Sequence, residues 1–208
     1  MRCLGEMRLA KRLTKRGMVH SDDLLAWTVD GPLEHILVSE SDLQERVAEM
    51  GSAISAHYGD RKPVLVGVLT GAYVFMADLA RAIQVPLEVE FMAISSYGTA
   101  TATSGVVQIR KDLDVPIEGR DILIVEDIID SGLTLRYLRD LLQRRNPRDI
   151  RIAALLRKDR PGASDIPVDW LGFDIPDEFV VGYGLDAGRK YRHLPFIATL
   201  NPERHNFD

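Results

Sequence analysis

The chain has 208 residues, a size that suits one α/β domain with its own core, alone or with a small subdomain. Its formal net charge of -5 argues against a general nucleic-acid binder, which usually carries a basic face, although a local basic patch is not excluded. Cys3 is the only cysteine, which excludes an intramolecular disulfide and a cysteine zinc site and fits a reducing, cytoplasmic setting. No apolar run approaches the ~18 residues of a membrane span, so we expect no membrane association.

The N-terminal residues 1–30 are predicted to form an irregular or disordered extension, followed by a single domain over residues 31–208. Residues 1–16 are basic, but no apolar segment follows them, so they do not form a secretory signal. Met7 and Met18 are alternative starts of the native chain, and a basic contact arm is the less favoured interpretation of this segment.

The first predicted helix begins near Ser41, which stands at capping-box spacing from Gln44, and ends at Gly59. Apolar residues recur between these two ends at helical spacing. The remaining predicted elements are a strand at 63–69, a helix at 72–83, strands at 87–95, 106–110 and 121–125, a helix at 133–145, and strands at 149–156, 168–173 and 179–183.

This alternation of strands and helices predicts an α/β fold with a mostly parallel twisted sheet flanked by helices. Ligands of such folds bind beyond the carboxyl ends of the strands. Three groups of residues stand at those places: Thr70-Gly71, Glu126-Asp127 and Lys158.

The segment SSYGTATATSG at residues 95–105 is small and polar with one aromatic residue, Tyr97. Two interpretations are equally supported: a plain hairpin connection, or a mobile lid over a site.

The stretch VEDIIDSGLT at residues 125–134 combines an apolar strand end, three carboxylates and a small-residue loop that opens a helix. Backbone N–H groups at such a helix start bind phosphate, whereas carboxylates at a strand end accept hydrogen bonds from sugar hydroxyls or help to hold Mg²⁺. Together they predict a site for a phosphorylated sugar. A solvated strand end with a helix N-cap explains each feature separately but not all of them together.

Two common nucleotide motifs are excluded. The chain contains no G-x-x-x-x-G-K-[ST] sequence, and the glycines at 182–188 have the wrong spacing for a dinucleotide fingerprint.

Residues 122–134 resemble the phosphoribosyl-pyrophosphate motif of the type I phosphoribosyltransferases, and the Glu-Asp order at 126–127 resembles their 6-oxopurine branch. The resemblance covers roughly residues 32–203 and is strong at 69–73, 91–98, 155–158 and 179–186. It implies the type I fold with a small hood subdomain over the base site. The implied reaction transfers phosphoribosyl from phosphoribosyl pyrophosphate to hypoxanthine or guanine, giving IMP or GMP and pyrophosphate with Mg²⁺. Relatives are usually homodimers or homotetramers.

The resemblance assigns the donor to the strand end and the loop after it. Glu126 and Asp127 would hold the ribose hydroxyls directly or through the metal, and Asp186 would bind a second Mg²⁺. Asp130 would exchange a proton with N7 of the base as a general acid/base, and its structural alternative is a helix N-cap. The implied donor-binding residues are Glu126, Asp127, Asp130, Ser131, Gly132, Leu133, Thr134, Thr70, Gly71 and Arg192, the last of these pairing with pyrophosphate.

Three further residues are implied to bind the base. Lys158 would donate to the exocyclic O6, which selects against adenine because adenine presents an amino group there. Phe179 would stack on the purine and the Val180 backbone would contact its other edge. Their alternatives are a solvated charge for Lys158 and sheet core for Phe179 and Val180. Ser96 and Tyr97 would close over the transition state.

Two positions depart from the family pattern. Thr70-Gly71 stands where relatives often have Lys-Gly after an unusual cis peptide, and His193 stands where an aspartate often follows the pyrophosphate arginine. The rival hypotheses are a nucleotide-sensing regulator on the same fold and a phosphoribosyltransferase with adenine or xanthine preference. The base-site residues Lys158 and Phe179 favour an enzyme that uses 6-oxopurines.

Overall fold

The structure is a computed structural model that describes residues 33–97, 106–163 and 165–201. The predicted N-terminal extension therefore lies outside the described residues, and the single-domain boundary at 31–208 stays a prediction.

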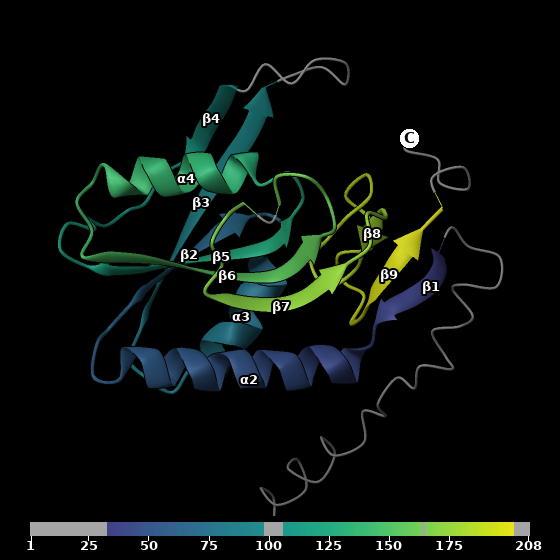
Figure 1. The fold of residues 1–208 in the computed structure, drawn as a ribbon, viewed down its shortest axis with the longest axis horizontal. Coiled ribbons are helices and arrows are strands. Elements are labelled where there is room, and N and C mark those ends of the chain that lie inside the picture. Colours follow the sequence, from purple (N-terminus) through teal and green to yellow (C-terminus); the bar gives the residue numbers. More distant parts are fainter. Residues whose placement is uncertain (1–32, 98–105, 164, 202–208) are drawn as a thin grey trace, which may run out of the picture.

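A six-stranded sheet in the order β4-β3-β2-β5-β6-β7 forms the centre of the fold (Figure 1). All neighbouring pairs are parallel except β3 and β4, which are antiparallel. The strands are β2 (Val64–Leu69), β3 (Glu88–Tyr97), β4 (Val106–Lys111), β5 (Asp121–Ile129), β6 (Asp149–Lys158) and β7 (Trp170–Ile175). The predicted α/β fold with a mostly parallel sheet is confirmed.

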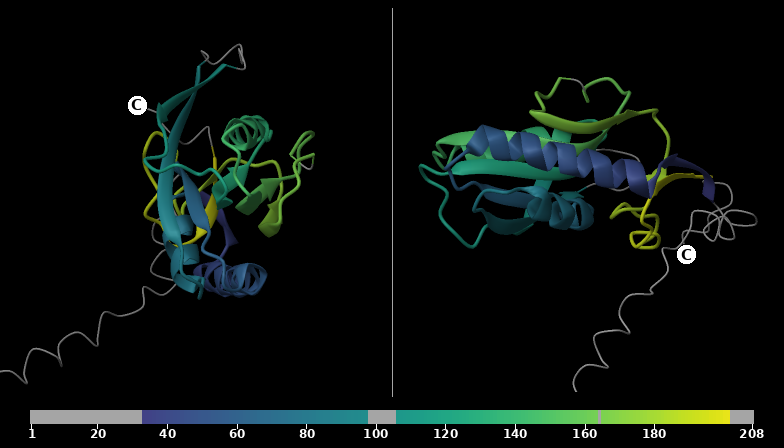
Figure 2. Two further views of the ribbon diagram at one scale, coloured as in Figure 1. Left: turned by 90° about the vertical axis from the view of Figure 1, so that its left-hand side faces the viewer. Right: turned by 90° about the horizontal axis from the view of Figure 1, so that it is seen from below.

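Three helices cover the two faces of this sheet. Helices α2 (Glu40–Tyr58) and α3 (Tyr73–Ala82) lie on one face and α4 (Leu133–Gln143) lies on the other (Figures 1 and 2). Each face has its own apolar cluster, in which alternate residues of the central strands pack against the helices. Strand β2, of sequence VLVGVL, is buried along nearly its whole length, as expected of a parallel strand covered on both sides.

Helix α2 begins two residues earlier than the sequence pattern predicts. Its N-cap is Ser39, whose hydroxyl oxygen accepts from the Asp42 backbone N–H at 3.2 Å. Ser39 and Asp42 have the same spacing as Ser41 and Gln44, so the chain contained two competing capping signals and the prediction used the wrong one.

A second, three-stranded sheet of order β1-β9-β8 lies at one end of the molecule (Figure 2). It consists of β1 (Leu33–Val38), β8 (Val180–Val181) and β9 (Ile197–Leu200), which are paired antiparallel. This is the predicted hood. The sequence pattern predicted neither β1 nor β9, and the strand predicted at 179–183 is only two residues long.

None of the helices in the described part of the chain has the length and apolar character needed to cross a membrane.

Candidate functional site

A pocket of about 300 Å³ opens at the carboxyl ends of the parallel strands, between the main sheet and the hood. It brings together eight of the predicted site residues from six separate stretches of the chain. Its lining consists of Gly71, Asp127, Ile128, Asp130, Lys158, Phe179, Val180, Leu185, Asp186 and Arg192.

The loop between β2 and α3 forms the floor of this pocket through its backbone. The Leu69–Thr70 peptide is cis, and a Cβ placed on Gly71 would lie 1.6 Å from Oδ2 of Asp127. On its other side Gly71 meets Gly184, where φ is +104° and an added Cβ would lie 2.2 Å from the Gly71 carbonyl oxygen. The positive φ and the backbone contact require glycine at 184, whereas a Cβ at 71 would displace the Asp127 carboxylate.

Glu126 and Asp127 lie within β5 and not beyond it, because the strand continues to Ile129. Successive strand residues point to opposite faces. Asp127 accordingly faces the large pocket, whereas Glu126 lines a smaller one formed with the loop at 130–134.

Both carboxyl groups have a raised pKa. Burial raises the pKa of Asp127 to about 6, and burial followed by the nearby Asp127 charge raises the pKa of Glu126 well above its usual range. Oε2 of Glu126 is buried and has no hydrogen-bond partner within the described structure. A buried acceptor of this kind fits a ligand hydroxyl or a hydrated cation.

The smaller pocket, of about 80 Å³, is formed by the start of α4. Gly132 is the N-cap residue in the left-handed conformation, with φ of +74°, and no side chain caps the helix. This differs from α2, which Ser39 caps. No side chain therefore competes for the first backbone N–H groups of α4, and an anion is the ligand that a helix N-terminus favours. Its lining contains Glu126, Ile128, Ile129, Asp130, Ser131, Gly132, Leu133, Thr134 and Leu135.

Asp130 lines both pockets and stands between them. It is not the helix N-cap that the alternative interpretation expected, because that position belongs to Gly132. Instead, its exposed carboxylate forms an ion pair with Arg160.

Lys158 is the last residue of β6, and its side chain is only 12% exposed. Its ammonium lies 3.5 Å from Oδ1 of Asp177, so it is not the freely solvated charge of the alternative interpretation. Phe179 is 44% exposed and lines the pocket, which excludes the core interpretation for this ring, whereas the Val180 side chain belongs to the core.

Arg192 also lines the large pocket. It donates to the Gly184 carbonyl oxygen and pairs with Oδ1 of Asp186 at 2.6 Å. Asp186 also accepts from the Arg189 backbone N–H at 2.7 Å. These contacts hold the guanidinium at the edge of the pocket.

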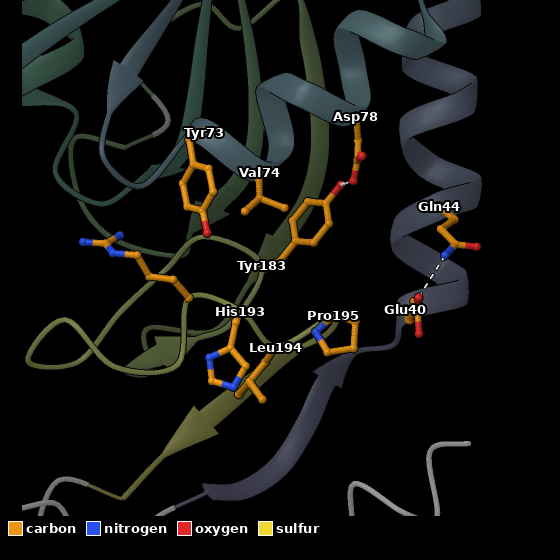
Figure 3. A pocket seen from close by; sticks show the side chains of 10 residues that line it. Glu40, Gln44, Tyr73, Val74, Asp78, Tyr183, His193, Leu194 and Pro195 are labelled. Atoms are coloured by element: carbon orange, nitrogen blue, oxygen red, sulfur yellow. Dashed lines mark hydrogen bonds between the residues drawn. The ribbon is translucent and has the colours of Figure 1, made fainter. Parts of the chain in front are cut away.

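Arg192 also borders a second pocket of about 300 Å³ between α2, α3 and the loop at 183–195 (Figure 3). There the Tyr183 hydroxyl donates to Oδ2 of Asp78 at 2.6 Å, which ties the loop to α3 (Figure 3). His193, the second departure from the family pattern, lies beside this second pocket (Figure 3).

The predicted metal ligands Glu126, Asp127 and Asp186 do not form a cation site made of protein atoms alone. No three His, Cys, Asp or Glu side chains of the described chain lie close enough to hold an ion. Asp127 and Asp186 nevertheless share the large pocket. One or two carboxylates together with water and ligand phosphates is the arrangement that Mg²⁺ adopts in phosphate sites, so the residues present fit that ion.

The roles of the predicted site residues stay predictions, and several residues in or beside the pocket were not predicted from the sequence. Ile128 and Leu185 contribute apolar lining, and Arg160 and Asp177 contribute charge, without a motif to mark them. Backbone pairing places Ser96 and Tyr97 at the end of the β3–β4 hairpin, but their side chains and residues 98–105 lie outside the described residues, so the lid stays a prediction.

Known proteins share both this sequence and this fold. A profile of the phosphoribosyl transferase domain matches residues 39–187. Hypoxanthine-guanine phosphoribosyltransferase of Bacillus subtilis is 51% identical over 170 residues, which cover 82% of this chain and 94% of that protein. The enzyme of the same name from Mycobacterium avium is 48% identical over 178 residues, 83% of this chain and 88% of that one.

A solved structure gives the same result. The crystal structure of a hypoxanthine phosphoribosyltransferase from Staphylococcus aureus matches with a TM-score of 0.80 and 43% identity, covering 84% of this chain and 95% of that one. The chain therefore belongs to the phosphoribosyltransferase family, in the branch of the hypoxanthine-guanine phosphoribosyltransferases.

Proposed function

We propose that the protein is a cytoplasmic purine salvage enzyme that transfers phosphoribosyl from phosphoribosyl pyrophosphate to hypoxanthine or guanine, giving IMP or GMP and pyrophosphate. The observation that carries this proposal is the single pocket that joins Asp127, Asp130, Lys158, Phe179 and Arg192. These are the groups that a sugar, a purine and a pyrophosphate require.

The donor would occupy both pockets. The uncapped start of α4, with the hydroxyls of Ser131 and Thr134, would bind the 5′-phosphate. Glu126 and Asp127 would accept hydrogen bonds from the ribose hydroxyls, which would give the unpartnered Oε2 of Glu126 a donor. Arg192 and the backbone around Gly71 would hold the pyrophosphate.

The base would lie against the exposed ring of Phe179. Lys158 would donate to O6, and Asp130 would face N7. An adenine amino group would place donor against donor at Lys158, which favours 6-oxopurines.

In the reaction the bond between C1′ and the pyrophosphate oxygen breaks, and a bond between C1′ and a purine nitrogen forms. The base loses a proton, which Asp130 accepts as general base. Positive charge develops on the ribose, so water must be kept out, since it would hydrolyse the donor. Ser96 and Tyr97 of the β3–β4 hairpin are proposed to provide that closure.

Asp127 and Asp186, together with the bound donor, would hold Mg²⁺, and Glu126 would add a further carboxylate nearby. The ion would neutralise negative charge on the departing pyrophosphate.

The test is a substrate panel with phosphoribosyl pyrophosphate and Mg²⁺. Hypoxanthine and guanine should give nucleotide and pyrophosphate, and adenine should not. Adenine turnover comparable to that of guanine would contradict the role of Lys158. Xanthine is included in the panel because it carries the same O6 as hypoxanthine and guanine.

A further inference from the structure

Four charged side chains form one row along the base side of the large pocket. Asp130 pairs with Arg160, Nε of Arg160 lies 3.0 Å from Oδ2 of Asp177, and Oδ1 of Asp177 lies 3.5 Å from the Lys158 ammonium. The charges alternate in sign along the row. Its two ends, Asp130 and Lys158, line the pocket, whereas the two middle residues, Arg160 and Asp177, do not.

The backbone that carries the two middle residues is held independently of the row. After β6 the chain turns tightly, with the Arg160 N–H donating to the Lys158 carbonyl at 2.9 Å and the Ala163 N–H donating to the Arg160 carbonyl at 3.2 Å. The Glu178 N–H donates to Pro176 at 2.9 Å in the connection that carries Asp177. Removing a side chain from the row should therefore leave the fold intact, all the more because Arg160 is 40% exposed.

Arg160 is the member on which the row depends. Within the described chain it forms the only ion pair of Asp130, and at the same time it occupies one oxygen of Asp177. Without it the Asp130 carboxylate could rotate freely, and Asp177 could turn both oxygens toward Lys158. Both end groups would then leave the geometry in which they meet a base, because a planar guanidinium holds two carboxylates in fixed directions that a solvated side chain does not.

We propose that Arg160 is a positioning residue of the base site: its guanidinium bridges Asp130 and Asp177 and so sets, at the two ends of one row, the carboxylate that meets N7 and the ammonium that meets O6. This inference rests on the proposed function. It assigns to Arg160 no contact with the substrate, since Arg160 does not line the large pocket.

The test compares Arg160→Gln with Arg157→Gln in the full-length protein. Arg157 is a matched control because it also pairs with an aspartate, Asp174, at 2.7 Å, but lies outside the row and the large pocket. For Arg160→Gln we expect kcat/KM for hypoxanthine to fall about 10- to 100-fold, the usual loss when a reacting group loses its orienting partner. The melting temperature should stay at the wild-type value, and the KM for phosphoribosyl pyrophosphate should rise less than the KM for hypoxanthine, because only the Asp130 end of the row borders the proposed donor site.

The double variant Arg160→Gln, Asp177→Asn distinguishes a shared row from two separate contacts. If the two residues act through one row, the double variant should lose no more activity than the more impaired single variant. If the activity losses of the two single variants multiply in the double variant, the inference is overturned. It is also overturned if Arg160→Gln is no more impaired than Arg157→Gln, or if its KM for phosphoribosyl pyrophosphate rises as much as its KM for the base. Turnover by the wild-type protein is measured first. If the wild type has no activity, the proposed function and this inference are both overturned. If the wild type is active and Arg160→Gln is unaffected, only the inference is overturned.

Discussion

Three carboxylates stand within five residues of one another, and the structure gives each a different environment. Glu126 is buried without a hydrogen-bond partner for Oε2, Asp127 faces the large pocket, and Asp130 is exposed and paired with Arg160. Two neighbouring acids, one buried and one partly buried, cost folding free energy when both are charged. Such a cost is typical of a site built to bind hydroxyls and cations rather than to stabilise the fold.

Asp127→Asn should therefore stabilise the free protein at neutral and alkaline pH. Burial raises the pKa of Asp127 to about 6 in the folded state, above its value of roughly 3.9 in an unfolded chain. The folded state then holds the proton more tightly, so stability falls as pH rises from about 4 to about 6 and stays low above that. Asparagine keeps the acceptor for the Ile128 N–H, which donates to Oδ1 at 2.9 Å, and removes the charge.

Urea unfolding at several pH values measures this effect. We expect the variant to gain about 1–3 kcal/mol at pH 8 and nothing near pH 4, while donor binding is lost. A variant that is less stable than the wild type at pH 8 would contradict this explanation.

Asp130→Asn should remove the general base while leaving the fold unchanged, because the side chain is exposed and does not cap α4. We expect kcat to fall about 10²- to 10⁴-fold with little change in donor affinity or melting temperature. Steady-state kinetics and donor titration provide the measurement. A kcat that stays within a few-fold of the wild type would leave Asp130 no role in proton transfer.

At the scale of elements, the site is assembled from the ends of strands and the loops that follow them. The β2–α3 loop offers its backbone, the β5–α4 loop offers an uncapped helix start, and the hood supplies Phe179. Thr70 is exposed in the first of these loops, next to Gly71 at the pocket floor.

Thr70→Lys should add a positive charge beside the proposed pyrophosphate position. A charge-assisted hydrogen bond there is worth about 1.5–3 kcal/mol when well placed. We expect a lower KM for phosphoribosyl pyrophosphate and tighter inhibition by pyrophosphate, with base preference unchanged. Product-inhibition kinetics would decide: an unchanged donor KM together with an unchanged inhibition constant would mean that the side chain at 70 points away from the ligand.

In the whole molecule, the two ends of the main sheet differ in what they contain. The carboxyl ends of the parallel strands line the pocket, whereas ion pairs connect the strands at the opposite end. There the buried carboxylate of Asp121 accepts from Nε of Arg148 at 2.8 Å and lies 3.6 Å from Arg61, and Glu88 pairs with Arg120 and Lys62. Stability and activity should therefore respond separately to substitution.

Arg148→Met should destabilise the protein without changing its kinetics. Hydrogen bonding to Arg148 holds the pKa of Asp121 below its usual value, so this pair contributes stability above a pH of about 4 and loses it as the pH falls. We expect the variant to lose about 1–3 kcal/mol at pH 7 and the difference to shrink in acid. Lys111→Met, which removes an exposed pair with Asp114, is the control and should cost less than about 1 kcal/mol. A fall in kcat in Arg148→Met would show that the two ends are coupled.

The main sheet, its helices and the loop proposed to bind the donor could be predicted from the sequence alone. Strands such as Val64–Leu69 and the segment at 125–134 carry their signals locally, because a strand covered on both faces must be apolar along its length and a phosphate loop must be small at the start of a helix. The resemblance to a known family supplied the roles of Lys158 and Phe179, which have no local signal of their own.

The hood and the ion pairs between Asp130 and Lys158 depend on tertiary packing. Strands β1 and β9 are short and come from opposite ends of the described chain, so what makes them strands is their pairing with each other and not their own sequence. In the same way, Arg160 and Asp177 are ordinary charged residues until the β6 and β7 ends place them between Asp130 and Lys158. Burial and charge pairing depend on which distant segments meet, and no pattern within one segment contains that information.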